Sequence, residues 1–285
     1  VSRASVHNIS IVRALKLGIG DHITVYKANM IIPQIAENLT QSGNLIIPDV
    51  CPVCGGEAKI IKSNDVESLY CMNPDCQAKK IKAFTLFVSR DAMNIDGFSE
   101  MTLEKFIGCG FIREYADIFH LDRYRDEIVT LEGFGDKSYN NLMNSVEQAR
   151  HTTLPRVIYS LGIPNIGLSN AKMICKEYKN DLDKMLAAPT EELAAMDGVG
   201  PVIAGAFVDF FAQEKNKTAL ELLLKEVELE QETFSEEALP LSGQSFVITG
   251  SLNHFENRSA LKEKIEALGG KVTGSVTGKT VCLIN

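Results

Sequence analysis

The chain has 285 residues, of which 45% are hydrophobic and 23% charged, and its formal net charge is −8. This length exceeds what one small core organises, so we expect two to four domains. No apolar run reaches the roughly eighteen residues of a membrane-spanning helix, and the charged start Val1-Ser2-Arg3 is unlike a secretory signal peptide.

Charge is distributed unevenly along the chain. Residues 1–90 carry ten Lys and Arg against seven Asp and Glu, whereas residues 91–238 carry fourteen against twenty-seven. An acidic body argues against a broad basic face for nucleic acid and predicts that any phosphate contact is local. The Glu-rich run 221–237 is interpreted as a solvated helix face and a linker.

Residues 1–48 carry mostly strand patterns. A short helix is predicted at 9–17, a half-buried strand at 22–27 and a second strand at 31–35, where Pro33 indicates an edge or a bulge. Two or three strands cannot close a core by themselves. We therefore expect part of a small β-barrel whose other strands lie upstream.

Four cysteines follow in a regular pattern. Cys51-Pro-Val-Cys54 is separated by sixteen residues from Cys71-Met-Asn-Pro-Asp-Cys76, and no histidine lies in this stretch. Two short pairs joined by a medium loop can form two knuckles around one tetrahedral metal ion. The spacing predicts a structural four-cysteine zinc site held by Cys51, Cys54, Cys71 and Cys76.

Other features of the cysteines bear on this interpretation. Gly55 and Gly56 follow the first pair, where a knuckle requires positive φ. Two disulfides are the weaker alternative to zinc. Cys109, Cys175 and Cys282 lie among apolar residues and are predicted to be ordinary buried thiols of a protein in a reducing cytosol.

The sequence after residue 77 consists of a helical region, a polar linker and a final segment that alternates strands with a helix. Residues 78–90 form a predicted amphipathic helix, and short helices broken by glycine continue to about residue 229. A polar linker then ends near Pro240. The last segment has the order β-α-β-β of a small parallel α/β domain, with a strand at 245–250, a helix at 261–268, and strands at 271–273 and 280–284.

A short turn recurs four times in the helical region. The copies are Ile95-Asp96-Gly97-Phe98-Ser99, Leu131-Glu132-Gly133-Phe134-Gly135, Ile163-Pro164-Asn165-Ile166-Gly167 and Met196-Asp197-Gly198-Val199-Gly200. Positions 97, 133, 165 and 198 are 36, 32 and 33 residues apart. A period near thirty indicates one repeated supersecondary unit.

Each turn leads into a helix and so exposes successive backbone N–H groups at a helix N-terminus. Such a site suits one phosphate of a nucleic acid backbone and reads no bases. The predicted phosphate-binding glycines are Gly97, Gly133, Gly135, Gly167, Gly198 and Gly200. The alternative is plain helix packing with glycine C-caps. Ser99 and Asn165 replace glycine in the first and third copies, so these two are expected to bind phosphate less well or only to pack.

Together these features resemble one family. The four-cysteine site is followed by Phe87-Val88-Ser89-Arg90-Asp91-Ala92-Met93-Asn94-Ile95-Asp96-Gly97 and by four helix-hairpin-helix motifs. Thr249-Gly250-Ser251-Leu252, Arg258 and Gly269-Gly270 look like the opening of a BRCT domain. Val1-Ser2-Arg3-Ala4-Ser5-Val6-His7-Asn8 and Lys27-Ala28-Asn29-Met30-Ile31-Ile32-Pro33 resemble the later part of an OB-fold. The order is similar to the C-terminal half of bacterial NAD-dependent DNA ligase.

The resemblance implies a multidomain α+β protein. Its expected parts are a partial OB-fold β-barrel (1–48), a four-cysteine zinc finger (49–77), an all-α helix-hairpin-helix domain with four motifs (78–232), a linker (233–239) and a truncated α/β BRCT domain (240–285).

It also implies a function. Such a chain clamps nicked double-stranded DNA for phosphodiester sealing in replication and repair. Lys27 would touch a phosphate, and Ile31 and Ile32 would press the minor groove at the nick, although barrel core is the better interpretation of these isoleucines from sequence alone. Asn29-Met30 stands where Gly-Asp is more usual, which leaves the conformation of this turn open.

The same resemblance places catalysis elsewhere. A separate N-terminal domain would hold the reactive lysine of a Lys-x-Asp-Gly motif and bind NAD and magnesium. The nearest string here, Asn94-Ile95-Asp96-Gly97, has Asn at the reactive position. We expect no catalytic residue in this chain, which would bind a nick without sealing it as a cytoplasmic, nucleoid-associated monomer, with a protein partner for the BRCT segment possible. The alternative function is a non-catalytic zinc, helix-hairpin-helix and BRCT scaffold.

Overall fold

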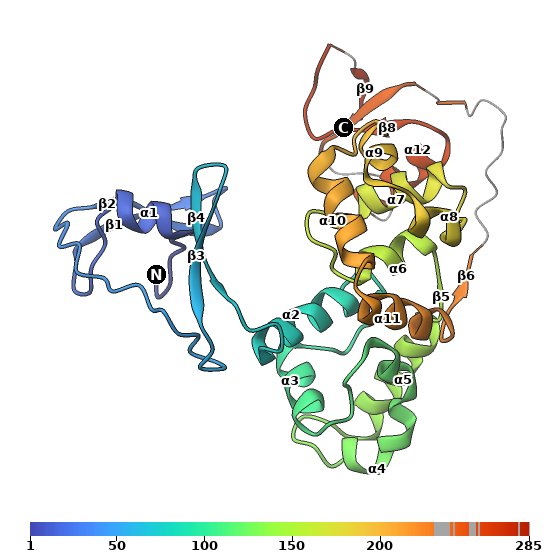
Figure 1. Ribbon diagram of the computed structural model, residues 1–285, viewed down its shortest axis with the longest axis horizontal. Helices are drawn as coiled ribbons and strands as arrows, with labels where there is room; N and C mark the ends of the chain where they lie inside the picture. Colours follow the sequence, from blue (N-terminus) through green and yellow to red (C-terminus); the bar gives the residue numbers. More distant parts are fainter. Residues whose placement is uncertain (231–239, 242, 251–254, 256, 279, 285) are drawn as a thin grey trace.

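A computed structural model describes residues 1–230, 240–241, 243–250, 255, 257–278 and 280–284. The chain forms three parts, which Figure 1 shows in sequence colours. A β-rich lobe carries the N-terminus, a helical body occupies the middle of the sequence, and a small α/β unit follows it. The expected linker 233–239 lies outside the described residues. No helix of the described residues is long and apolar enough to cross a membrane.

The N-terminal lobe contains one helix and two strands. Helix α1 (Ile9–Ala14) begins where the Asn8 side chain accepts a hydrogen bond from the Ile11 N–H. Strands β1 (Ile23–Ala28) and β2 (Ile32–Asn38) pair antiparallel, with a bulge beside Thr24. The prediction that the first strand is half-buried was wrong: all of β1 except Ala28 is exposed, because no second layer of the described chain covers this two-stranded sheet.

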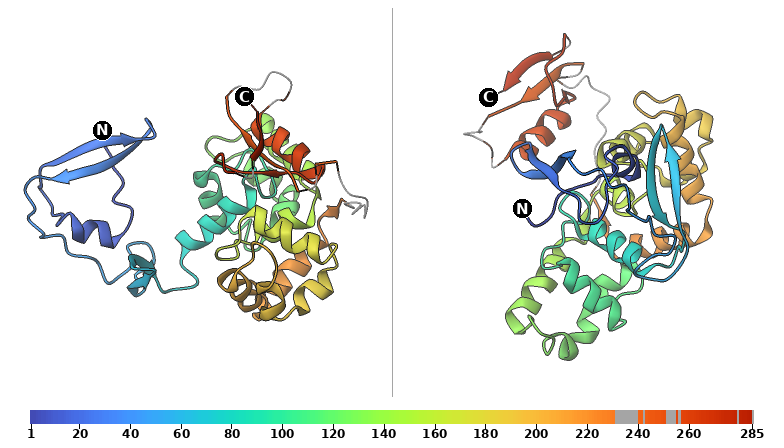
Figure 2. Two further views of the ribbon diagram at one scale, coloured as in Figure 1. Left: turned by 90° about the horizontal axis from the view of Figure 1, so that it is seen from above. Right: turned by 90° about the vertical axis from the view of Figure 1, so that its left-hand side faces the viewer.

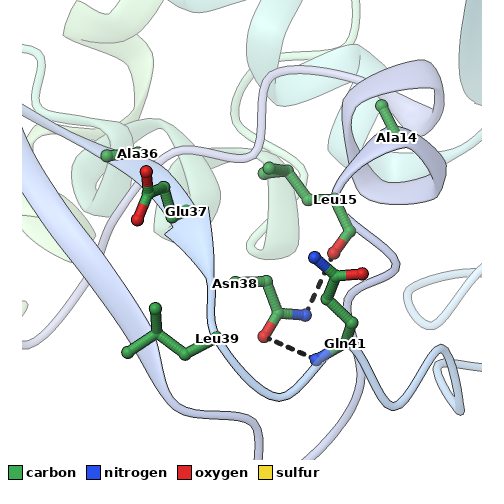
Figure 3. A pocket seen from close by; sticks show the side chains of 7 residues that line it. All are labelled: Ala14, Leu15, Ala36, Glu37, Asn38, Leu39 and Gln41. Carbon is green, nitrogen blue, oxygen red and sulfur yellow. Dashed lines mark hydrogen bonds between the residues drawn. The ribbon is translucent and has the colours of Figure 1, made fainter.

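One buried side chain fixes the end of this hairpin (Figure 3). The Asn38 amide, 4% exposed, donates to the Leu15 and Lys16 carbonyls at 3.0 Å and to Asp21 at 2.7 Å. Its carbonyl accepts from the Thr40 and Gln41 backbone N–H groups. A fully bonded buried amide of this kind holds α1 against the end of β2.

The cysteine region is a second hairpin. The predicted loop between the cysteine pairs is instead an antiparallel pair, β3 (Ala58–Ser63) and β4 (Val66–Cys71). It packs on α1, where the Ser10 hydroxyl accepts from the Glu67 N–H at 2.8 Å and Arg13 forms an ion pair with the Glu67 carboxylate. The N-terminal helix and the cysteine hairpin are therefore one connected unit.

The helical body is built from short helices around one hydrophobic core. In chain order the helices are α2 (Gln77–Val88), α3 (Glu100–Gly108), η1 (Tyr115–Tyr124), α4 (Arg125–Ile128), α5 (Asp136–Gln148), α6 (Leu154–Ser160), α7 (Leu168–Glu177), α8 (Leu182–Ala187), α9 (Thr190–Ala194), α10 (Pro201–Phe211) and α11 (Glu214–Leu224). Buried aromatic side chains at its centre include Phe87, Phe106, Phe119 and Phe207. Because the core is continuous from α2 to α11, the four repeated turns belong to one body.

A polar cluster around Arg150 joins distant parts of this body. The Arg150 guanidinium donates to the Phe119 and Glu226 carbonyls, both at 2.9 Å, and pairs with the Glu226 carboxylate at 3.1 Å. Next to it, β5 (His151–Thr152) pairs in parallel with β6 (Glu228–Leu229), so part of the Glu-rich run forms a strand that its charge had not predicted. This cluster fastens the end of α11 to η1 and α5.

The C-terminal unit has the predicted parallel topology. Strand β7 (Ser245–Ile248) lies between β8 (Lys271–Val272) and β9 (Thr280–Ile284), and all pairings are parallel. Helix α12 (Arg258–Ala267) lies against the sheet (Figure 2), with Leu261 and Ile265 packed on Phe246.

Two details of this unit depart from the sequence prediction. Helix α12 begins three residues earlier than expected, because the Asn257 side chain caps it by accepting from the Ala260 N–H. Cys282 is exposed on the edge strand β9, and Cys109 is exposed at the end of α3, so the prediction of buried thiols was correct only for Cys175. An apolar neighbourhood in sequence does not bury a residue at a helix end or on an uncovered edge strand.

The Arg150 cluster generates a stability prediction. We expect Arg150→Ala to lower the free energy of unfolding by about 2 kcal/mol, because it leaves the half-buried Glu226 carboxylate without its main cation. Arg123→Ala, at an exposed position of η1, is the matched control and should change stability little. Denaturant unfolding followed by circular dichroism measures both, and equal stability of the two variants would contradict the prediction.

Candidate metal centre and nucleic-acid interface

The four predicted ligand cysteines converge at the base of the second hairpin. All four sulfur atoms lie within 4.8 Å of one another, with Cys51 Sγ 3.9 Å from Cys76 Sγ and Cys54 Sγ 3.6 Å from Cys71 Sγ. A tetrahedral zinc ion with bonds of about 2.3 Å puts its sulfurs about 3.8 Å apart. The cysteines are unpaired thiols in the structure, and these distances suit a shared metal ion rather than the alternative of two disulfides.

Backbone geometry explains the residues that follow the first pair. The Gly55 N–H donates to the Cys51 carbonyl at 2.9 Å, and Gly55 has φ +66°, as the sequence predicted for a knuckle. Gly56 is needed for space instead: a Cβ there would lie 3.1 Å from the Asn73 Cβ and 3.3 Å from the Cys54 sulfur. The first knuckle therefore closes tightly against the second.

The electrostatics of the cluster suit a cation. The Gly56 N–H and then the Asn73 side chain lower the pKa of Cys54 to about 6. Desolvation, and to a lesser extent the neighbouring cysteines, raise the pKa of Cys71 to about 12. Four adjacent thiols cannot all ionise without a compensating positive charge, and a thiolate-binding metal supplies it. Thus the donor set, spacing and chemistry all fit a metal site of four thiolates.

The position of Cys76 gives this cluster a structural role. Cys76 is buried and is the N-cap residue of α2, the first helix of the helical body. An ion bound by all four sulfurs would therefore connect the N-terminal lobe directly to that body (Figure 1).

The four repeated turns have one backbone conformation. The third residue of each has positive φ: +95° at Gly97, +87° at Gly133, +63° at Asn165 and +81° at Gly198. In the last three copies the following N–H donates to the carbonyl three residues back, as in a type II turn. Asn165 keeps this conformation because Asn tolerates left-handed backbone better than other side chains.

Each turn delivers its fifth residue to the start of a helix. Ser99, Gly135, Gly167 and Gly200 are the N-cap residues of α3, α5, α7 and α10, so each turn joins two helices as the sequence predicted. The N-cap residue of the three glycine-capped helices has no side chain to accept from their first amides, and at α5 the Ser138 hydroxyl accepts from the Gly135 N–H itself at 2.9 Å. In the first copy, by contrast, the Ser99 hydroxyl accepts from the Thr102 N–H, so one amide is already bonded.

The three N-cap glycines have no steric reason within the chain to lack a side chain. Their φ values of −168°, −84° and −83° are open to other residues, and a Cβ on any of them would meet no atom within 4 Å. By contrast, a Cβ on Gly198 would lie 2.4 Å from Met173 Cε. The first glycine of a turn thus serves the fold, whereas the second leaves the helix start accessible from outside.

The repeated sequence motif did not predict which charged side chains lie near the turns. Lys105 on α3 donates to the Glu132 carbonyl at 2.9 Å, which joins the first motif to the second turn, and Arg125 pairs with Asp136 at 2.6 Å beside the same turn. The third turn has no acidic residue between Glu147 and Glu177. The sequence next to this turn thus supplies no carboxylate, although Glu266 of α12 pairs with Lys172 on the following helix at 3.8 Å.

The residues predicted for the N-terminal lobe lie apart from these turns. Lys27 is on β1 and exposed, and Ile31 and Ile32, at the tip and start of β2, are 78% and 49% exposed. The described chain therefore does not bury these isoleucines in a core. Figure 1 shows β1 and β2 in the lobe on the far side of the cysteine hairpin from the helical body.

Two other features bear on possible chemistry. The string Asn94-Ile95-Asp96-Gly97 lies in the first turn, where the Asp96 N–H donates to the Ser145 hydroxyl, and so it is a structural element.

A cavity of about 390 Å³ beside α1 and β2 is lined by Ala14, Leu15, Ala36, Glu37, Asn38, Leu39 and Gln41 (Figure 3). Asn38 is fully bonded to its neighbours, so the polar side chains left at this hollow are those of Glu37 and Gln41.

Comparison with known proteins decides which family has this combination. Residues 156–220 match the family model of the helix-hairpin-helix motif, and residues 236–284 match that of the BRCA1 C Terminus (BRCT) domain. The chain is 59% identical over its whole length to a DNA ligase of Lachnoclostridium phytofermentans and 55% identical to one of Ruminiclostridium cellulolyticum. It is 38% identical to a DNA ligase of Thermosipho africanus.

This chain belongs to the bacterial DNA ligase family. It corresponds to the C-terminal portion of such a ligase and spans 44% and 43% of the length of the first two relatives. Its third and fourth turns, with α6, α7, α9 and α10, are helix-hairpin-helix motifs by both geometry and family match. The β7–β8–β9 sheet with α12 lies in the BRCT match.

The different roles of the two glycines in the fourth turn can be tested by a matched pair. Gly198→Ala should lower the free energy of unfolding by about 1–3 kcal/mol, because it combines positive φ with a contact to Met173. Gly200→Ala should lower it by less, about 0.5–1 kcal/mol, because its φ suits any residue and only the poorer N-cap preference of Ala counts. Thermal or denaturant unfolding measures both, and a larger loss for Gly200→Ala would disprove this division of roles.

Proposed function

We propose that this chain is the DNA-binding portion of an NAD-dependent DNA ligase and clamps nicked duplex DNA for sealing in replication and repair. The observation that carries the proposal is the set of uncapped helix starts at Gly135, Gly167 and Gly200, each with open space where a side chain would stand. A phosphate oxygen can approach such backbone N–H groups closely and is attracted by the helix dipole.

This mode of binding explains why an acidic chain can bind DNA. The amides of one helix start together contact a single phosphate. A few such local contacts can hold the DNA backbone, so the protein needs no broad basic face. Such contacts are independent of base sequence, as a nick-sealing enzyme requires. We assign phosphate contacts to Gly97, Gly133, Gly135, Gly167, Gly198 and Gly200.

The N-terminal lobe would supply the second side of the clamp. In this proposal residues 1–48 are part of an OB-fold, Lys27 contacts a phosphate, and Ile31 and Ile32 press the minor groove at the nick. The exposure of all three side chains supports this assignment. The remaining expected domain limits, including the boundary at 77–78 and the linker at 233–239, belong to the same proposal.

We assign a structural zinc ion to Cys51, Cys54, Cys71 and Cys76. The sulfur spacing and the need for a compensating cation support zinc. When bound, the ion would supply four strong cross-links and no reaction step. Because Cys76 is also the N-cap residue of α2, the bound ion would fix the angle between the two DNA-contacting parts.

NAD and magnesium would be bound by the nucleotidyltransferase part of such a ligase. The sequence of this chain contains no Lys-x-Asp-Gly string, and Asn94 cannot attack a phosphorus as a lysine amine does. We therefore expect this chain by itself to bind a nick as a monomer without joining its ends.

The proposed function is tested at Gly167, where bulk can be added without strain. Gly167→Val should weaken binding to nicked duplex by about fivefold or more, for any base sequence, because the new side chain fills the space of the phosphate. Fluorescence polarisation with a labelled nicked duplex and its intact counterpart measures this, and wild type should prefer the nicked one.

Gly108→Val is the matched control for that experiment. Gly108 ends α3, away from the repeated turns, and a Cβ there also meets nothing within 4 Å. Its affinity should equal that of wild type. Wild-type affinity of Gly167→Val would mean that the turns only pack helices, and absence of any DNA binding by wild type would refute the proposed function.

The metal assignment has its own test. Cys71→Ser or Cys76→Ser should reduce bound zinc from one per chain to well below one and should weaken nick binding. Cys109→Ser, at an exposed cysteine outside the cluster, should keep the metal. Elemental analysis of the purified variants measures this, and full zinc content in the first two would refute the four-cysteine site.

A further inference from the structure

Two β-hairpins of this chain use the same kind of turn but different residues. Between β1 and β2, Asn29 and Met30 have φ values of +49° and +62°. Between β3 and β4, Asn64 and Asp65 have φ values of +47° and +65°. Two consecutive positive φ values favour Gly, Asn and Asp, which Asn64 and Asp65 satisfy. Met30 does not, since an unbranched apolar side chain gains nothing from this backbone conformation.

The local structure gives Met30 no compensating contact. Its side chain is 88% exposed, more than any other large hydrophobic residue of the described chain, and its neighbour Ile31 is 78% exposed. A left-handed methionine is unfavourable for folding, and because its side chain is exposed, no burial offsets that cost. Something other than the stability of the hairpin therefore favours an apolar side chain at this tip.

The charges of the two hairpins indicate what that partner is. Lys27 lies near the tip of the first hairpin, opposite Pro33, whereas the one carboxylate of its two strands, Glu37, lies at the other end, opposite Thr24. The second hairpin has Asp65 at its tip, paired with Lys62 at 3.0 Å. An apolar tip with a cation close behind it is complementary to a polyanion with an apolar interior, which describes the minor groove and stacked bases of duplex DNA.

We propose that Met30 is the leading apolar contact of the β1–β2 hairpin with the minor groove of duplex DNA at a nick. This rests on the proposed function and extends it to a residue that has no role there. Methionine is flexible and polarisable, so it can fit against base edges or a partly opened base step without a fixed shape. A nick favours this contact, because the broken strand unstacks there more easily than an intact one.

The test uses substitutions that separate the side chain from the turn. Met30→Asn removes the apolar contact, adds no charge and suits positive φ, whereas Met30→Leu keeps an apolar side chain. Met30→Asn should bind nicked duplex about tenfold more weakly than wild type, and Met30→Leu should stay within about twofold. The thermal midpoint of Met30→Asn should equal or exceed that of wild type.

Two further readouts identify the kind of contact. With 2-aminopurine opposite the nick, wild type should raise the fluorescence by unstacking, and Met30→Asn should lose this signal. Met30→Asn should leave the salt dependence of binding unchanged, whereas Lys27→Gln should reduce the slope of log K against log salt by about one. Asp65→Met, which puts methionine at the matching position of the second hairpin, should not alter DNA affinity.

The outcomes distinguish this inference from the proposed function. Wild-type binding of the nicked duplex by Met30→Asn would overturn the inference alone. A lower thermal midpoint of Met30→Asn would also overturn it, because methionine would then serve the fold. A change in self-association without a change in DNA affinity would assign the tip to a protein contact instead. Absence of DNA binding by wild type would overturn both the function and the inference.

Discussion

Left-handed backbone at one residue per repeat is the constraint on which the helical body depends. At Gly97, Gly133, Asn165 and Gly198 the chain turns sharply enough for consecutive helices to pack. The residue two positions later is in each case the N-cap of the next helix. Without this conformation the hydrophobic faces of the short helices could not share one core. The same turn leaves the first amides of the following helix at the surface. Folding and the proposed phosphate binding thus depend on one backbone geometry.

The two glycines of a repeat have different structural roles. The first has positive φ, and at Gly198 it also lies against Met173, so a side chain there conflicts with the fold. The second has ordinary φ and open surroundings and is the N-cap residue of the next helix, so it leaves the helix start open to an external ligand. This separation is useful, because it shows where a substitution can change binding without changing stability.

The cysteine cluster and the Arg150 cluster hold the larger parts together. Cys76 is the N-cap residue of α2, and Cys71 is the last residue of β4. A shared ion would therefore join the helical body to the β3–β4 hairpin, which packs on α1. Arg150 ties the end of α11 back to η1 and α5. The Arg150 guanidinium also lies over the ring of the buried Phe119, so this polar cluster sits against the hydrophobic core. In the proposed function, the cysteine cluster would set the angle between the parts that contact DNA, whereas the Arg150 cluster holds the helical body together.

The sequence by itself determined the features that depend on local spacing. These are the cysteine ligand set, the period of the repeated turns, helix α2, and the parallel order of the C-terminal strands. Only the tertiary structure decided what lies exposed: the faces of β1, Cys109, Cys282, and Met30 at a strained tip. It also decided long-range pairings such as β5 with β6. The physical reason is that backbone turns and ligand spacing are set by neighbours in sequence, whereas burial depends on which distant surfaces meet.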